Sequence, residues 1–369
     1  MKKLIVLILA AFVALPVLAK PVHFMVSEDV SYDDNIYFAK TDKEDSVISS
    51  TRVGAQYKTN IPGSSLKLTA DGMVGYNAYT ENASRNNYWD GLAQLDLAND
   101  NIKLGDKFIF TSDPINNAEV DRAKRLQNNG YFSWQSSTDK TFGIGINLSD
   151  IYNYYIDDEW QNLNRNRFNA GAQLNYNVSP KTKFFVEYMF SDITYDENKV
   201  NNSRGDTFAL GVNGQLASKV TGTAKATYAM RNYNHDLAGA DNYADVVGYY
   251  VELTWKPTRH DKIRLSGERR LEETIYGTDR YYVDTAVSLY MGHQFWDKWT
   301  AAVTLTYDNM DYPKAERKDD YFSVRPELDY QFKDWLSAGV WYNFTARHST
   351  LGDAEYERNR GGLFVRAMF

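Results

Sequence analysis

The chain has 369 residues, 15% of them aromatic and none of them cysteine, and its formal net charge is −7. The lack of cysteine excludes a disulfide framework and thiolate chemistry. The charge forms no basic block, so we expect no nucleic acid partner. After residue 20, no segment approaches the roughly 18–20 continuous apolar residues of a membrane helix.

The first residues predict export from the cytoplasm. Lys2 and Lys3 precede the apolar run Leu4–Leu18, and Ala19 precedes Lys20. A basic start, a short apolar stretch and a small residue before the cleavage point are typical of a signal peptide. We predict that residues 1–19 are a signal peptide and that residues 20–369 form the exported domain. An uncleaved anchor helix is the alternative, but the apolar run is short and Pro16 interrupts it.

Alternation of apolar and polar residues recurs after residue 22. From Phe168 to Val178 every second residue is apolar, and the residues between are Asn, Gly or Gln. A period of two predicts β-strands, because successive side chains of a strand point to opposite faces. The polar face is small and polar rather than rich in Lys and Glu, which favours a wet interior.

The connections alternate between short turns and longer polar loops. Asn60–Gly63 and Ser137–Asp139 are short turns, while Asp34–Asp45 and Ser112–Lys124 are longer loops. This pattern gives a repeat of about 40 residues, with two strands of about 10–14 residues in each repeat, whereas a propeller blade would need four short strands. Strands of this length cross a bilayer when tilted, and short periplasmic turns with longer external loops are typical of outer-membrane barrels. We predict an all-β fold, a transmembrane antiparallel up-and-down β-barrel of about 18 strands in the bacterial outer membrane, or 16 if one hairpin is wrongly counted.

Two strands carry a carboxylate on their apolar face. Glu28 lies in the segment Val22–Tyr32, and Asp106 lies in Ile102–Phe110. A β-bulge would turn either carboxylate inward. A position close to a membrane interface would make its exposure inexpensive. The sequence leaves both explanations open.

The last strand, Glu355–Phe369, ends on an aromatic residue. Leu363, Val365 and Phe369 share one face, and Phe364 is an apolar exception on the other. This ending resembles the closing strand of outer-membrane barrels, which the barrel-assembly machinery recognises. The resemblance implies that Leu363, Val365 and Phe369 are the assembly signal, although an edge strand of a soluble protein can look similar.

Other segments resemble one family of barrels. The segment Asp29–Tyr37, which contains YDDNIY, and the segments Leu174–Tyr195, Val220–Ala224 and Leu253–Thr258 carry this resemblance. It is similar to the β-barrel porins associated with bacterial exopolysaccharide loci. The resemblance implies an outer-membrane barrel that takes part in polysaccharide export with periplasmic proteins, and it brings no active site with it.

Alternation also predicts which charged side chains line the lumen. A charge facing lipid at the bilayer midplane costs roughly 2–4 kcal/mol, so we expect these side chains to point inward. They are Lys67, Asp71, Glu187, Glu252, Arg264, Glu268, Arg270, Asp284, Arg325, Glu327 and Arg366. Such residues either form structural ion pairs only, or provide a lining of mixed sign that selects among solutes.

Catalysis and metal binding have little support. His235 and His348 lie in predicted external loops beside Asp236 and Ser349, but neighbouring residues of a solvated loop seldom form a catalytic pair. No His spacing suggests zinc. We therefore predict no enzyme activity, no cofactor and no metal site, and we regard the acidic loop clusters as solvated.

A barrel of 16–18 strands encloses an aqueous lumen. We expect an outer-membrane channel for polar solutes that takes part in export of an extracellular polysaccharide. A general or sugar-specific diffusion porin is the alternative, and a hydrolase or a structural or adhesive barrel is less favoured. The expected partners are outer-membrane lipid, lipopolysaccharide, the barrel-assembly machinery, the polysaccharide and periplasmic export proteins. In general porins the third loop folds inward. Here Ser112–Lys124 has about 13 residues, and the sequence does not decide whether it reaches into the lumen.

Overall fold

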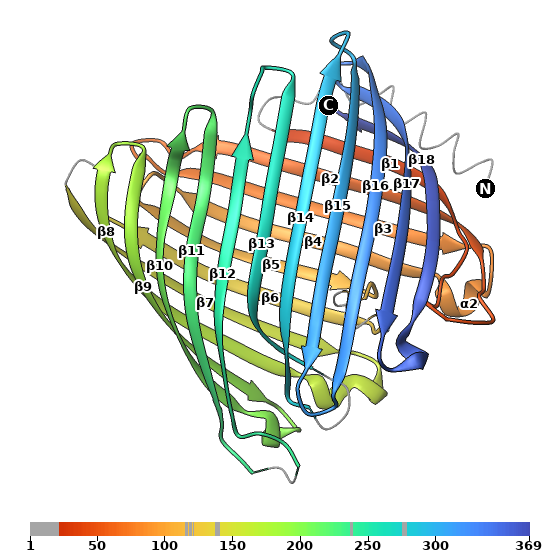
Figure 1. Ribbon diagram of the computed structural model, residues 1–369. Coiled ribbons are helices and arrows are strands. Elements are labelled where there is room, and N and C mark those ends of the chain that lie inside the picture. The colour runs from red at the N-terminus through yellow and green to blue at the C-terminus, as the bar shows by residue number, and fades with distance from the viewer. Residues whose placement is uncertain are drawn as a thin grey trace.

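The computed structural model describes residues 22–369 except 115–116, 118–119, 121, 137–140, 237–238 and 275–278. The described residues form 18 antiparallel strands in one sheet that closes on itself (Figure 1). The predicted up-and-down barrel is confirmed, with 18 strands rather than 16. The predicted signal peptide, residues 1–19, and the predicted turn Ser137–Asp139 lie outside the described residues, so both stay predictions.

Each strand pairs with the next one along the chain, and β18 pairs with β1. The strands are β1 (Val22–Asp33), β2 (Ser46–Asn60), β3 (Lys67–Tyr79), β4 (Tyr88–Ala98), β5 (Ile102–Thr111), β6 (Arg125–Gln135), β7 (Phe142–Tyr155), β8 (Arg165–Ser179), β9 (Thr182–Tyr195), β10 (Ser203–Ala217), β11 (Val220–Tyr233), β12 (Tyr243–Trp255), β13 (Asp261–Glu273), β14 (Tyr281–Phe295), β15 (Trp299–Tyr312), β16 (Arg317–Lys333), β17 (Leu336–Ser349) and β18 (Tyr356–Met368). Four long connections contain short helical turns, α2 (Ala83–Asn86), η1 (Asp158–Leu163), η2 (Lys199–Asn201) and η3 (Gly352–Ala354). Among the described helices, none is long and apolar enough to cross a membrane.

The last strand closes the barrel against the first. The β1–β18 register runs from Met25↔Met368 to Asp33↔Arg360. Beyond it, the backbone of Phe369 exchanges two hydrogen bonds with Phe24, at 2.9 and 3.1 Å. Closure pairs the first strand with the last, so neither is left as an open edge for pairing with another chain.

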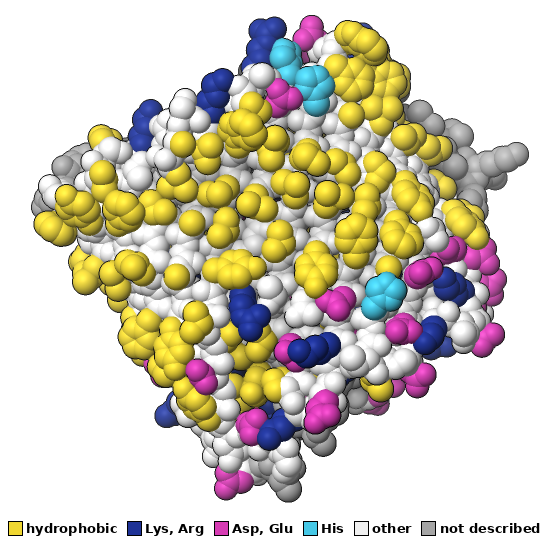
Figure 2. All heavy atoms as spheres, in the orientation of Figure 1, with side chains coloured by type: hydrophobic (Ala, Val, Ile, Leu, Met, Phe, Trp, Pro, Cys, Tyr) yellow, Lys and Arg dark blue, Asp and Glu magenta, His cyan; other side chains and the backbone are white. Residues whose placement is uncertain are grey.

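Each strand has an apolar outer face and a polar inner face. In β9, Phe184, Val186 and Tyr188 are exposed on the outside, while Phe185 and Glu187 are buried on the inside. Figure 2 shows the outer side chains as a broad hydrophobic band across the strands, with charged side chains gathered mainly below it. This lower rim is the long-loop end of the barrel, and the opposite rim, where connections such as the one between β14 and β15 lie, is the short-turn end.

The two carboxylates that the sequence places on an apolar strand face, Glu28 and Asp106, do not turn inward. Glu28 stays on the outer face of β1, in an uninterrupted register with β2, and accepts hydrogen bonds from the hydroxyls of Ser49 and Thr51, both at 2.5 Å. Asp106 stays on the outer face of β5 and accepts a hydrogen bond of 2.8 Å from Asn128. The explanation by a bulge is therefore wrong for both residues. Neighbouring polar groups on the outer face satisfy each carboxylate instead.

Tyrosines at the long-loop end make the same diagonal contact in several hairpins. A Tyr hydroxyl on the outer face of one strand donates to a side-chain oxygen of the next strand, two residues off the direct pair. The pairs are Tyr188–Asp206 at 2.6 Å, Tyr228–Asp245 at 3.3 Å, Tyr307–Asp320 at 2.6 Å and Tyr342–Asn359 at 2.5 Å. An amphipathic ring with a bonded hydroxyl suits the boundary between hydrocarbon and headgroups. These pairs therefore explain why charge appears on the outer surface just beyond the hydrophobic band.

The apolar exception in the last strand fills a specific space. Phe364 points inward and is 3% exposed. A Cβ atom on Gly339 of the paired strand β17 would lie 2.5 Å from its ring, so the glycine makes room for the phenylalanine. The Arg366 guanidinium lies 3.8 Å from the centre of the same ring. Leu363 and Val365 point outward, and the Phe369 ring stacks on Trp335 with 5.2 Å between centroids.

Candidate functional site

The lumen is lined by the polar faces of the strands. The register places all the charged residues predicted to line it on this inner side: Lys67, Asp71, Glu187, Glu252, Arg264, Glu268, Arg270, Asp284, Arg325, Glu327 and Arg366. The structure brings Glu268, Arg270 and Asp284 into one group. It brings Arg325, Glu327 and Arg366 into another. The other five lie apart from both groups. The role of all eleven residues in selecting solutes stays a prediction.

The third long loop, Ser112–Lys124, crosses the lumen. It leaves β5 and returns through β6, yet the Asn117 amide donates a hydrogen bond to the carboxylate of Asp308 on β15. Arg347 on β17 donates a hydrogen bond of 3.3 Å to the Asn117 carbonyl oxygen. In the strand order, β15 and β17 lie on the opposite side of the closed sheet from β5 and β6. The loop therefore does reach inward, and it divides the lumen at the long-loop end.

The base of this loop is fixed to the near wall. Ala123 is buried against Tyr155 of β7 and Leu163 of η1. The Arg122 guanidinium lies over the rings of Tyr79 and Tyr88, at 4.9 and 4.7 Å from their centroids. Contacts at its base and at Asn117 thus fix the described residues of this loop to both sides of the channel.

A second obstruction comes from the wall itself. Strand β12 begins at Tyr243 and β13 ends at Glu273, but their register runs only from Tyr249↔Arg269 toward the short-turn end. A Cβ atom on Gly248 would lie 2.1 Å from the carbonyl oxygen of Arg269. Gly248 points inward, so the β13 backbone crosses the inner surface of β12 at this glycine. The side chain of Leu271 then packs with Ala244 and Val246, which also point inward.

Glu273, at the end of β13, anchors this inward fold. Its carboxylate pairs with Arg165 of β8 at 3.1 Å, Arg231 of β11 at 3.4 Å and Arg167 of β8 at 3.5 Å. The Tyr195 hydroxyl of β9 donates a further hydrogen bond of 3.2 Å. Neighbouring strands are about 4.8 Å apart, so five strand intervals along the wall separate β13 from β8 by about 24 Å. Contact at 3.1 Å requires that the end of β13, beyond Arg269, has left the wall and reaches into the lumen.

The hairpin between β13 and β14 is also held at its tip. Arg280 donates to the Asn242 side chain at 2.9 Å and to the His235 carbonyl oxygen at 2.8 Å. Tyr233 of β11 donates to the Arg280 carbonyl oxygen at 3.3 Å. The long loop after β11 therefore supports the inward fold of the neighbouring hairpin.

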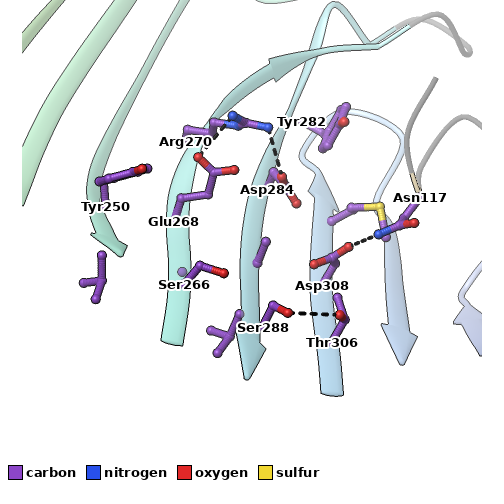
Figure 3. Close-up of a pocket in the computed structure, with 15 residues that line it drawn as sticks. Asn117, Tyr250, Ser266, Glu268, Arg270, Tyr282, Asp284, Ser288, Thr306 and Asp308 are labelled. Atoms are coloured by element: carbon purple, nitrogen blue, oxygen red, sulfur yellow. Dashed lines mark hydrogen bonds and ion pairs between the residues drawn. The ribbon is translucent and has the colours of Figure 1, made fainter. Parts of the chain in front are cut away.

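An acidic cavity of about 310 Å³ lies beside the crossing loop (Figure 3). Arg270 of β13 pairs with Glu272 at 2.7 Å, Glu268 at 3.1 Å and Asp284 of β14 at 3.9 Å. Asp308, bonded to Asn117, closes the far side. Three carboxylates thus share one guanidinium, with Asp308 as a fourth carboxylate at the cavity, so this part of the lumen wall carries an excess of negative charge.

The wall beyond it is basic. Strands β16, β17 and β18 are fully described, and their inner faces carry six arginines, at positions 317, 325, 347, 358, 360 and 366, against three carboxylates, at positions 319, 327 and 329. Arg325 lies over Trp341 at 4.3 Å and pairs with Glu327 at 3.3 Å. Arg360 lies over the same Trp341 ring at 5.4 Å. The acidic cavity on β13–β15 therefore borders a basic stretch of wall on β16–β18, because β15 pairs directly with β16.

Sequence reasoning missed several residues of this site. Glu272 alternates in step with the predicted lining residues Glu268 and Arg270, and Asp308 lies on the same face as Thr304 and Thr306, so the alternation contained a signal for both. Glu273 had no such signal, because alternation assigns it to the outer face. His348, considered as a catalytic candidate, faces outward opposite Asp320. Among the described residues, no three potential ligand side chains converge on a metal position.

Comparison with known proteins identifies the fold and a family profile. Residues 22–369 match the profile of a family described as "Putative beta-barrel porin 2". Similar solved structures include the outer membrane protein OpdK of Pseudomonas aeruginosa (TM-score 0.53, 9% identity, covering 95% of this chain and 100% of that chain). OpdL of Pseudomonas aeruginosa (TM-score 0.51, 10% identity, 94% and 98% covered) and OccAB4 of Acinetobacter baumannii (TM-score 0.50, 13% identity, 96% and 100% covered) are also similar. Identities this low establish a shared fold alone. No curated protein matches the sequence.

Proposed function

The chain belongs to the family described as Putative beta-barrel porin 2, and from this premise we propose that it is a diffusion channel for small polar solutes. As a closed barrel of a porin family, the protein lies in the bacterial outer membrane, with the long-loop end as its expected external side. Its family is one of channels rather than enzymes.

The observation that carries this proposal is the crossing of the lumen by the third loop. The loop leaves the wall between β5 and β6, and its residue Asn117 contacts Asp308 and Arg347 on the far wall. A polar lumen of 18 strands would otherwise leave a wide aqueous path. The loop and the inward hairpin together favour passage of solutes small enough to move around them.

Export of a polysaccharide, the main expectation from the sequence, is not supported by the family profile or by the similar structures. The geometry favours the diffusion porin instead. A polymer chain would have to displace the Asn117 contacts and the Glu273 contacts before it could thread the lumen. Small solutes need no such rearrangement.

The test measures permeation against solute size. The mature chain is refolded, checked for a folded barrel by heat-dependent gel migration, and reconstituted in planar bilayers and in liposomes. We expect stable ionic steps and liposome swelling that falls steeply from monosaccharides to tetrasaccharides. Asn117→Ala should raise conductance and shift the size limit upward, whereas Asn198→Ala, the same change in another long loop, should have no effect. Absence of conductance from the folded barrel, or equal swelling rates for monosaccharides and tetrasaccharides, would overturn the proposal.

A further inference from the structure

A second cavity, of about 480 Å³, lies among the loops of the expected external side. Four connections contribute to it: the first loop with Tyr37, the second with Arg85, the third with Ser112 and Arg122, and the fourth with Trp160. We call it the vestibule. It is separate from the acidic cavity, which the β12–β15 wall lines together with Asn117.

The vestibule presents two arginines that have no acidic partner among the described residues. The Arg122 guanidinium lies over the inward-facing rings of Tyr79 and Tyr88, and the Arg85 guanidinium lies 5.3 Å from the centroid of Tyr37. Neither guanidinium forms an ion pair with a carboxylate anywhere in the described part of the chain. Stacking on an aromatic ring leaves the edge of a guanidinium free, and this edge has the geometry that binds a carboxylate through two parallel hydrogen bonds.

Ser112 gives an independent indication of a ligand. It is 7% exposed and lines the vestibule, yet its hydroxyl has no hydrogen-bond partner among the described residues. Buried polar groups are nearly always satisfied, so an orphaned hydroxyl at the wall of a cavity is a position that a bound molecule can complete.

The remaining walls suit a flat, ring-sized body. Trp160, Tyr37 and Phe38 supply aromatic surface. The carboxylates of the vestibule are already engaged: Glu159 accepts from the Trp160 indole at 3.1 Å, and Asp157 accepts from the Lys124 backbone at 2.9 Å. The acidic rim is thus occupied by the protein itself, while the basic groups Arg85 and Arg122 remain available.

We propose that the vestibule is a capture site for small solutes that carry a carboxylate on a six-membered ring, bound before they pass the constriction. The carboxylate pairs with Arg122 and Arg85, the Ser112 hydroxyl donates to the solute, and the ring lies against Trp160. This inference rests on the proposed diffusion function and names the class of solute that the channel concentrates at its mouth. Sugar acids and aromatic acids share this chemistry.

The experiment measures equilibrium binding of small solutes to the folded full-length mature barrel in detergent. Binding is detected by calorimetry and by Trp fluorescence. The probes are glucuronate and benzoate, with glucose and glucosamine as ring-sized controls that lack a carboxylate. We expect one or both acids to bind and the controls not to bind. Arg122→Gln should weaken binding by about tenfold or more, since a hydrogen bond to a charged group is lost. Ser112→Ala should weaken it by a smaller factor.

The matched control is Arg204→Gln, which removes an exposed arginine of the outer face that pairs with Asp192 at 3.1 Å. This variant should bind as the wild type does. Binding of glucose or glucosamine as tightly as glucuronate, unchanged affinity of the folded Arg122→Gln barrel, or no binding of either acid would overturn the inference. Conductance of the same preparations separates the two proposals: a conducting barrel that binds no acid refutes the capture site alone, and a barrel that binds acid without conducting refutes the diffusion function alone.

Discussion

Neutralising Glu273 should release the inward fold of the β13–β14 hairpin. The side chain of Glu273 is 4% exposed, and it is the acidic partner shared by Arg165, Arg167 and Arg231. Glu273→Gln keeps the shape of the side chain but removes its charge, so the arginines lose their common counterion. Breaking a buried ion pair by removing one partner costs about 3–5 kcal/mol. Arg167 is the most solvated of the three, so we take the lower end of the range, about 3 kcal/mol.

The cost should appear as local opening rather than as unfolding of the barrel. The hairpin tip can leave the inner wall while the β13–β14 register stays intact. A loss of about 3 kcal/mol raises the population of the open hairpin by roughly a hundredfold, because each 1.4 kcal/mol is a factor of ten. Single-channel recording should therefore show larger or more frequent conductance steps. Trypsin should also cleave faster after Arg280, because in the folded barrel this residue anchors the hairpin tip to the β11–β12 loop.

The control replaces an acidic residue that is one-third exposed and pairs with a largely exposed arginine. Asp192→Asn breaks the pair with Arg204 on the outer surface, where such pairs are worth about 0–1 kcal/mol. Its conductance and cleavage rate should equal those of the wild type. If Glu273→Gln also behaves as the wild type in both assays, the ion cluster does not hold the hairpin inward and the reasoning is refuted.

Three further changes test the packing, the assembly signal and the lining. Gly248→Val should destabilise the folded barrel by about 1–3 kcal/mol in urea unfolding, because its Cβ would meet the Arg269 carbonyl oxygen at 2.1 Å. Gly72→Val is the control and should be neutral, since a Cβ there has open space around it. Equal stability of the two variants would contradict the inward path of β13. Phe369→Ala should lower the heat-modifiable fraction assembled in cells if the terminal aromatic is read as an assembly signal, and unchanged assembly would remove that role. Arg366→Gln should shift the reversal potential in a salt gradient toward cation selectivity, since it removes a positive charge from the inner wall, and no shift would mean that this position does not contact permeating ions.

The two walls of the constriction explain why mixed charge is compatible with an open path. Glu268, Glu272, Asp284 and Asp308 lie on β13–β15, while arginines dominate β16–β18. The acidic group on β13–β15 and the arginines on β16–β18 differ in the sign of their excess charge, so part of the field of each extends into the water of the lumen. A solute with both a charged and a polar end can contact the two walls at once.

The sequence by itself predicted about 18 strands, with 16 as the alternative, and it determined the order of pairing and the face on which nearly every side chain lies. These are local properties: a period of two fixes the face, and turn residues between strands fix which strands become neighbours. The same rule placed Arg270 and Asp284 inside. It also kept Glu28 on the outside, where Ser49 and Thr51 satisfy it without any bulge.

Only the tertiary structure decided how the lumen is narrowed. Asn117 meets Asp308 across the full width of the barrel, and Glu273 meets Arg165 five strands away, distances that no local pattern encodes. Alternation assigned Glu273 to the outer face, and the residue keeps that face of its strand. Strand β13 moves inward where it passes Gly248 of β12. The outward-facing carboxylate of Glu273 is therefore buried and contacts arginines on the inner face of β8 and β11. The physical reason is that the direction of a side chain is a local property of its strand. The path of the strand depends instead on contacts with residues that are distant in the sequence and become neighbours only when the barrel closes.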